Sequence, residues 1–207
     1  MVPAAALVIR ELTAADLPAA AETLGRAMRD NPLHVRAYGP DPDRREGLLA
    51  RQFSASLPRQ LDAGGAILGA FDRREPHALL GAAAFVPPGR CRPSAASRVR
   101  SLPALFGSHG ITRAWRTLVW AYEWSRRDPE TTHWHLGPVG VDRHRQGHGI
   151  GTMLLRAFSE RMDALEATAY LETDRLENVP FYERFGFQVV ADGTVLGVPN
   201  WFMIRTG

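Results

Sequence analysis

The stretch Val139-Gly-Val-Asp-Arg-His-Arg-Gln146-Gly-His-Gly149-Ile-Gly151-Thr152 decides the fold of this 207-residue chain. It starts at the end of an apolar, strand-like run and places three glycines at alternate positions directly before an amphipathic helical pattern. Glycine lets the backbone approach a ligand closely, and the first amides of a helix have no partner within the helix. Because those amides lie at the positive end of the helix dipole, the stretch predicts a cradle for an anion.

The composition limits how such an anion would be held. All 25 basic side chains are arginines, which excludes a Schiff-base lysine, a pyridoxal-phosphate lysine and the lysine of a Walker-type phosphate loop. A phosphate must therefore bind backbone amides, arginines or small polar side chains. With 45% hydrophobic residues and a net charge of +3, residues 1–207 should form one domain around its own core.

Other classes of site and location are excluded by simple counts. Cys91 is the only cysteine, so we expect neither an internal disulfide nor a cysteine-based zinc site. His133, His135, His144 and His148 have no carboxylate that completes a ligand set, so we expect no metal. The apolar runs are shorter than the ~18 residues that cross a bilayer, and the first residues do not resemble a secretory signal. We therefore expect a cytoplasmic protein that does not bind membranes.

The apolar patterning predicts a mixed α/β (α+β) chain with helices on both faces of its sheet. A helical insert over about 90–130 interrupts the pattern, and its segment 90–127 holds eight arginines and one acid, Glu123. The insert's helix is apolar on two flanks, so either both are packed, or the flank with Trp120 and Trp124 lines a pocket or a subunit contact. The expected strands span 7–12, 66–71, 78–86, 134–141, 168–173, 188–191 and 201–205, and the other helices span 15–29, 48–61, 150–165 and 179–185.

The opening stretch resembles the coenzyme A loop of the GNAT superfamily of N-acetyltransferases, with the motif Gln146-x-x-Gly149-x-Gly151. Leu171-Glu-Thr and the later segment Asn178-Val-Pro-Phe-Tyr182-Glu-Arg-Phe-Gly186-Phe187 are similar to that superfamily's Asn…Tyr-Glu-x-x-Gly-Phe region. Within it, residues 134–205 are most similar to the puromycin N-acetyltransferases. The resemblance implies the GNAT fold: a mixed central sheet of about six to seven strands, splayed after the fourth, with the extra helical insert before that fourth strand.

The resemblance implies acetyl-CoA as co-substrate and direct transfer of the acetyl group to a primary amine of a small molecule, such as an aminonucleoside or another antibiotic-like amine. Cys91 is then not needed as a nucleophile. Pro138 cannot donate to a strand ladder, which suits a strand that loses its partner. Asn178 could also cap its helix. The residues that match the family's cofactor-binding positions are Val139, Gly140, Val141, Gln146, Gly147, His148, Gly149, Ile150, Gly151, Thr152, Asn178 and Tyr182.

Two proton transfers require catalytic groups. Tyr182 matches the superfamily's tyrosine acid, which protonates the leaving thiolate. The base that deprotonates the amine could be His135, Glu123 or a chain of waters. His135 matches the position of a catalytic glutamate in one branch of the superfamily, and regular alternation would put it on one face with Gly137 and Val139, toward the thioester.

Two other classes of function remain open at this point. The chain could be a protein or peptide N-acetyltransferase. It could also be a non-catalytic protein of the same fold that binds an acyl-CoA or, through the Arg-rich segment with Trp115, Trp120 and Trp124, a nucleic acid. No nucleic-acid motif is present and the net charge is small, so we expect a small-molecule amine as partner, in a monomer or a homodimer.

Overall fold

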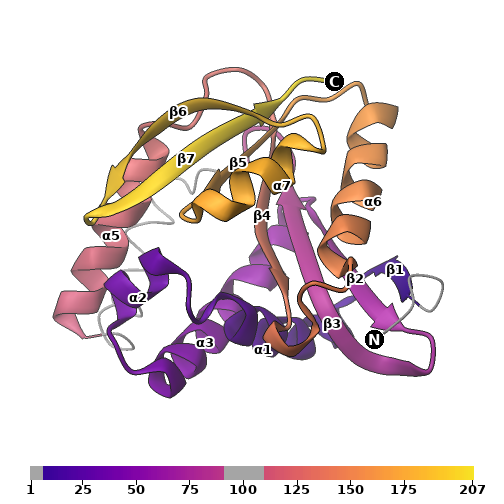
Figure 1. Ribbon diagram of the computed structural model, residues 1–207, viewed down its shortest axis with the longest axis horizontal. Helices are drawn as coiled ribbons and strands as arrows, with labels where there is room; N and C mark the ends of the chain where they lie inside the picture. Colours follow the sequence, from indigo (N-terminus) through magenta and orange to yellow (C-terminus); the bar gives the residue numbers. More distant parts are fainter. Residues whose placement is uncertain (1–6, 91–109) are drawn as a thin grey trace.

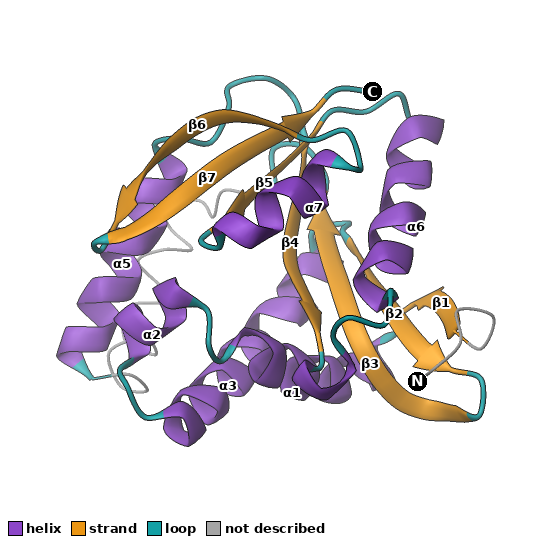
Figure 2. Cartoon of the chain, viewed as in Figure 1, coloured by secondary structure: helices purple, strands orange, loops and turns teal. Residues whose placement is uncertain are grey.

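The computed structural model describes residues 7–90 and 110–207, which are built around one seven-stranded sheet (Figures 1 and 2). The strands lie in the order β1-β2-β3-β4-β5-β7-β6. A mixed sheet of six to seven strands is therefore confirmed. The strands are β1 (Leu7–Glu11), β2 (Ala66–Asp72), β3 (Glu75–Val86), β4 (Trp134–Val141), β5 (Ala169–Thr173), β6 (Gln188–Val195) and β7 (Val198–Arg205).

The sheet splits between β4 and β5, as the resemblance implied. The pairs β1–β2, β2–β3 and β3–β4 are antiparallel, as are β5–β7 and β6–β7. Strands β4 and β5 are parallel and pair only at Trp134–Ala169 and His135–Tyr170. From Leu136 onward β4 diverges from β5, so one side of its backbone faces the opening between the two halves of the sheet (Figure 1).

Helices cover both faces of the sheet and enclose two apolar cores. Helices α6 (Ile150–Ala164) and α7 (Val179–Glu183) bury one core. Helices α1 (Leu17–Met28), α2 (Pro32–Tyr38) and α3 (Pro42–Asp62) bury the other, together with α5 (Ile111–Ser125). Within the described residues, three short 3-10 helices connect these elements: η2 (Ala14–Asp16), η3 (Arg143–Arg145) and η4 (Leu176–Asn178). No helix of the described segments is long and apolar enough to cross a membrane.

Several boundaries differ from the sequence prediction. The periodicity gave no helix between residues 30 and 47, yet α2 forms there and α3 begins at Pro42, after Asp41 accepts hydrogen bonds from the amides of Asp43 and Arg44. Strands β6 and β7 run to a two-residue turn at Leu196-Gly197, where both φ values are positive, 53° and 82°. Such a turn matches the twist of paired strands and allows a longer hairpin than hydropathy indicated.

Helix α5 is the described part of the predicted insert. Trp120 is buried in the core with α2, and the indole Nε1 of Trp124 donates to Asn200 Oδ1 on β7 at 3.1 Å. The opposite flank is exposed in the described structure, with Ile111 78% and Trp115 64% accessible. The flank with the two tryptophans is therefore packed within the domain. Residues 91–109, including Cys91, lie outside the described residues.

His34 of α2 should make the fold sensitive to acid. Its ring lies edge-on to Trp120, with centroids 5.1 Å apart, and burial lowers its pKa to about 3, with Arg45 adding to the effect. The unfolded chain takes up this proton below ~6.5, whereas the folded chain does not. We expect the free energy of unfolding to fall by up to ~1.4 kcal/mol per pH unit from this residue as pH decreases from ~6.5 toward 4.

Urea denaturation of the wild type and of His34→Leu at several pH values measures this term. The variant should lose stability less steeply over that interval, because it removes the titrating group and keeps an apolar side chain. Equal slopes for the two proteins would show that His34 does not contribute.

Candidate active site

The first half of the loop between β4 and α6 is held by hydrogen bonds. Asp142, directly after β4, accepts a hydrogen bond from Arg26 Nε of α1 at 2.9 Å and another from the backbone amide of His144 at 3.0 Å. Gln146 Nε2 donates back to the carbonyl of Val141 at 3.1 Å. These bonds fix the course of the loop relative to the end of β4.

Two glycines with positive φ values then turn the chain into α6. Gly147 and Gly149 have φ values of 76° and 78°, which residues other than glycine rarely adopt. A Cβ on either residue would meet no atom within 4 Å. Gly149 is the N-cap of α6 and offers no side-chain acceptor to the helix. The first amides of α6, at Ile150, Gly151 and Thr152, are therefore not occupied by a side-chain cap and can donate to an anion. The open space around both glycines fits the approach of a diphosphate.

The middle of β4 carries a β-bulge that changes which side chains share a face. Val139 pairs with Ala83 and Leu136 with Phe85, so two residues of β4, Gly137 and Pro138, lie opposite one residue of β3. Gln60 Nε2 of α3 donates to the Gly137 carbonyl at 3.2 Å. Leu136 and Val139 consequently both face the core under α6.

The bulge corrects the predicted orientation of His135. Alternation without a bulge put His135 and Val139 on the same face, and this prediction is wrong because the extra residue shifts the alternation by one. His135 lies on the face opposite Leu136, which α1, α2, α3 and α5 cover. The loop that leads into α6 and the His135 side chain therefore approach the split from opposite sides of the sheet.

His135 forms a pair with Glu172 of β5 across the last residues that join the two strands. His135 Nε2 lies 2.8 Å from Glu172 Oε2, and the side chains are 22% and 4% exposed. The Tyr170 ring packs edge-on against the imidazole with centroids 5.6 Å apart. Sequence analysis missed Glu172, although a glutamate in a short, otherwise apolar or small-residue strand was a signal that it had a buried partner.

Tyr182 lies in the core under α6 and α7, on the face of the sheet opposite the His135 side chain. Its ring contacts Phe181 and Phe187, with centroids 5.3 Å and 6.0 Å away. Burial raises the pKa of its hydroxyl above the ordinary value, and the negative charge of Asp174 raises it further. The tyrosine therefore keeps its proton at neutral pH, as a proton donor must.

Asp174 connects this region to the helices on the opposite face. It follows β5 directly, and its Oδ2 accepts a hydrogen bond from the backbone amide of Leu33 in α2 at 2.7 Å. Burial raises the pKa of its carboxyl group. No local pattern predicts this contact between residues 141 positions apart.

Asn178 does not cap α7 with its side chain, so that expectation is wrong. Its Nδ2 instead donates to Thr173 Oγ1 at the end of β5, at 3.2 Å. This bond orients the amide at the mouth of the split. The residue is thus placed beside the strand that borders the opening.

Glu123, the second candidate base, has two basic neighbours just past the C-terminal end of its own helix. Its carboxylate lies 2.7 Å from Arg127 Nη1 and 3.6 Å from Arg126 Nη1. Arg127 in turn lies over the ring of Phe202, 5.4 Å from its centroid. A role as proton acceptor would compete with these ion pairs.

Two further features involve other residues, the first of them His133, whose ring packs against Tyr170 with centroids 5.3 Å apart. His133 Nε2 contacts Asp128 Oδ1 at 3.0 Å, and both side chains are buried.

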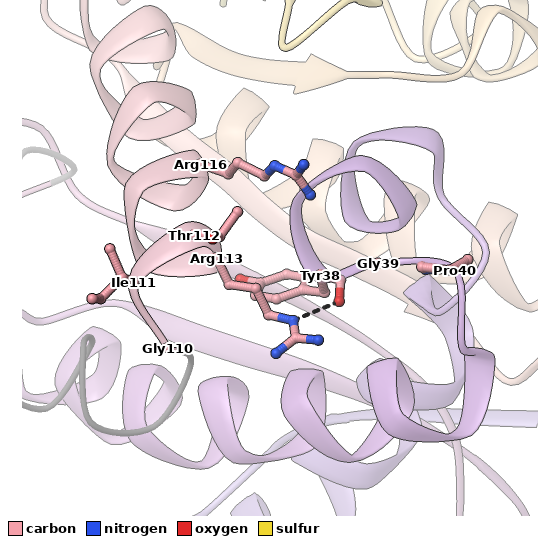
Figure 3. Close-up of a pocket in the computed structure, with 8 residues that line it drawn as sticks. All are labelled: Tyr38, Gly39, Pro40, Gly110, Ile111, Thr112, Arg113 and Arg116. Atoms are coloured by element: carbon pink, nitrogen blue, oxygen red, sulfur yellow. Dashed lines mark hydrogen bonds between the residues drawn. The ribbon is translucent and has the colours of Figure 1, made fainter.

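A pocket of about 350 Å³ opens between the end of α2 and the first turn of α5, where Arg113 Nε donates to the Tyr38 carbonyl at 2.8 Å and Arg116 extends alongside (Figure 3). None of the predicted catalytic or cofactor-binding residues lines this pocket. Within residues 7–90 and 110–207, no group of three His, Cys, Asp or Glu side chains could hold a metal.

Comparison with known proteins agrees with this arrangement. Residues 107–187 match the model of the acetyltransferase (GNAT) family. The fold is similar to that of a Corynebacterium glutamicum protein described as histone acetyltransferase HPA2 and related acetyltransferase, with a TM-score of 0.74 and 23% identity over 97% of this chain and 96% of that chain.

Two more distant structures contain the coenzyme. PaiA N-acetyltransferase from Thermoplasma acidophilum, in complex with coenzyme A, has a TM-score of 0.61 and 14% identity over 97% and 99% of the two chains. A GNAT family acetyltransferase from Brucella melitensis, in complex with acetyl-CoA, has a TM-score of 0.53 and 19% identity over 97% and 87%. The family match covers residues 107–187, and the similarity to these structures shows that the chain has their fold.

Proposed function

We propose that this protein is an acetyl-CoA-dependent N-acetyltransferase that moves the acetyl group directly to a primary amine of a small molecule. One observation carries the proposal: β4 leaves β5 after His135, and its open edge leads into the uncapped N-terminus of α6. The open edge offers backbone groups to the pantetheine arm and the acetyl carbonyl, and the helix offers amides to the diphosphate.

Each predicted cofactor-binding residue has a task in this proposal. Val139, Gly140 and Val141 present the backbone along the split, and Asn178 binds the pantetheine arm from its other side. The loop residues Gln146, Gly147, His148 and Gly149 and the first amides of α6 hold the diphosphate. Several hydrogen bonds to charged oxygens, each contributing ~1.5–3 kcal/mol, can replace a lysine.

The reaction needs two proton transfers that involve groups of the protein, and no covalent intermediate on the protein. The amine arrives as an ammonium ion and loses a proton to His135. Its nitrogen then forms the bond to the acetyl carbon as the carbon–sulfur bond breaks, Tyr182 gives its proton to the departing sulfur, and the acylated nitrogen loses its second proton to solvent. Solvent returns a proton to Tyr182 and removes one from His135, so the sulfur gains a proton in place of the acetyl group and one proton is released. Glu123 and a water chain remain the alternatives to His135.

The covering of the His135 face supports a small acceptor. The amine must reach the acetyl carbon from the side of the sheet opposite α6, where α2 and α5 contact each other and α5 contacts β6. Figure 1 shows α5 beside the hairpin of β6 and β7, with α2 and α3 below it. Helices in these positions leave less room for a folded protein or a long peptide than an uncovered sheet face would.

A panel of amines tests the acceptor class. Purified protein is incubated with acetyl-CoA and aminonucleosides such as puromycin, small polyamines, lysine or peptide N-termini, and free thiol is measured. We expect kcat/KM for at least one small amine to exceed that for every peptide by at least ~10-fold. A higher value for peptides would favour a peptide acetyltransferase, and acetyl-CoA binding without transfer to any amine would favour a binding protein.

A further inference from the structure

The carboxylate of Glu172 is more buried than an ionisable group usually is without a specific partner. Only 4% of its side chain is exposed, and it projects from β5 toward His135 on β4. A buried carboxylate is costly unless it is hydrogen-bonded, and the 2.8 Å contact to His135 Nε2 supplies such a bond. The pair thus lies at the point where the two halves of the sheet separate.

This contact decides which ring nitrogen of His135 carries the proton. An ionised carboxylate can only accept hydrogen bonds, so Nε2 must donate to it. In the neutral imidazole the lone pair is then on Nδ1. The edge of the Tyr170 ring packs against the same imidazole, and the Tyr170 hydroxyl donates to the Arg127 carbonyl at 3.3 Å, so the ring has a second fixed neighbour.

We propose that Glu172 is a positioning residue that holds His135 in the tautomer with the proton on Nε2, so that Nδ1 takes the proton from the acceptor amine. The inference rests on the proposed function. Glu172 itself does not touch the reacting atoms. Its negative charge also stabilises the imidazolium that forms when the amine proton is transferred to His135. The imidazole becomes neutral again when solvent removes that proton.

The spectroscopic test reads the tautomer directly. The protein is labelled with ¹⁵N-histidine, and the resonance of His135 is assigned by its loss in His135→Gln. In the wild type above the pH of protonation, we expect the Nε2–H tautomer to dominate. In Glu172→Gln the amide N–H can donate to Nε2 instead, so the Nδ1–H tautomer should increase. A wild-type His135 with the proton on Nδ1, or an unchanged ratio in the variant, would overturn the proposal.

Kinetics separate positioning from a structural role. We expect Glu172→Gln to lower kcat by ~10–100-fold with an unchanged dissociation constant for acetyl-CoA, and Glu172→Asp, which keeps the charge, to retain more activity. The double variant Glu172→Gln/His135→Gln should be no slower than His135→Gln alone, because Glu172 acts through His135. Multiplicative losses, or a Glu172→Gln variant as fast as the wild type, would contradict this inference.

The controls keep the two proposals distinguishable. Glu160→Gln removes an exposed carboxylate from α6 and should change neither the kinetics nor the ¹⁵N spectrum of His135. If Glu172→Gln does not fold, the wild-type tautomer and the activity of Glu172→Asp decide the question. A wild type that binds acetyl-CoA and acetylates no amine overturns the proposed function, whereas an active wild type matched by Glu172→Gln overturns only the role of Glu172.

Discussion

Replacing Gly149 with glutamate is expected to weaken acetyl-CoA binding by at least ~100-fold, because a charged oxygen held by helix amides loses several bonds of ~1.5–3 kcal/mol each. Gly149 has a φ of 78° and precedes the first turn of α6. A glutamate there would bring strain, bulk and a negative charge to the position proposed for the diphosphate. Isothermal calorimetry with acetyl-CoA measures the effect.

Gly89→Glu is the matched control for this experiment. Gly89 has a φ of 73°, and a Cβ there also meets nothing within 4 Å, so the two substitutions carry a similar backbone cost. Gly89 lies in the turn after β3, away from the α6 N-terminus. Normal acetyl-CoA binding by Gly149→Glu, or an equal loss in both variants, would refute the assignment of the loop.

Tyr182→Phe is expected to lower kcat by ~100-fold or more, the usual contribution of a positioned proton donor. The phenylalanine keeps the ring contacts with Phe181 and Phe187, so the fold and the dissociation constant of acetyl-CoA should change little. Because burial and Asp174 raise the pKa of the Tyr182 hydroxyl, the wild type should keep its donor protonated throughout the neutral range. Steady-state kinetics with the best amine of the panel measure the change.

Tyr122→Phe controls for loss of a tyrosine hydroxyl elsewhere. Tyr122 lies on the exposed flank of α5, where 60% of it is accessible, and its substitution should leave kcat within about 2-fold of the wild type. If Tyr182→Phe also retained kcat, the leaving sulfur would depart without this donor, and the proposed role of Tyr182 would be wrong.

The sequence was most informative where short-range rules determine the structure. The strand before the glycine-rich loop and the amphipathic α6 after it follow from local spacing, and both form where they were predicted. The β5 strand and the short helix after it were likewise visible in order. These elements need only their own residues and one core to pack against.

Contacts between residues far apart in the chain were not predictable from this single sequence. The bulge at Gly137-Pro138 depends on the register with β3, and it moved His135 to the other face from Val139. Glu172 contacts His135, 37 positions earlier in the chain, because β4 and β5 pair at their first residues. Helix α2 was missed because its contacts with α3, α5 and Asp174 stabilise seven residues whose own periodicity is weak.

The short pairing between β4 and β5 links the stability of the domain to its ligand. Only two residue pairs join the strands there, so the two halves of the sheet share few backbone hydrogen bonds across the split. A ligand that binds both edges of the split acts as a removable cross-link, favouring the folded state by ~2.7 kcal/mol at a concentration one hundred times its dissociation constant. Thermal unfolding should therefore occur at a higher temperature as acetyl-CoA is added, and amide exchange along β4 and β5 should slow together.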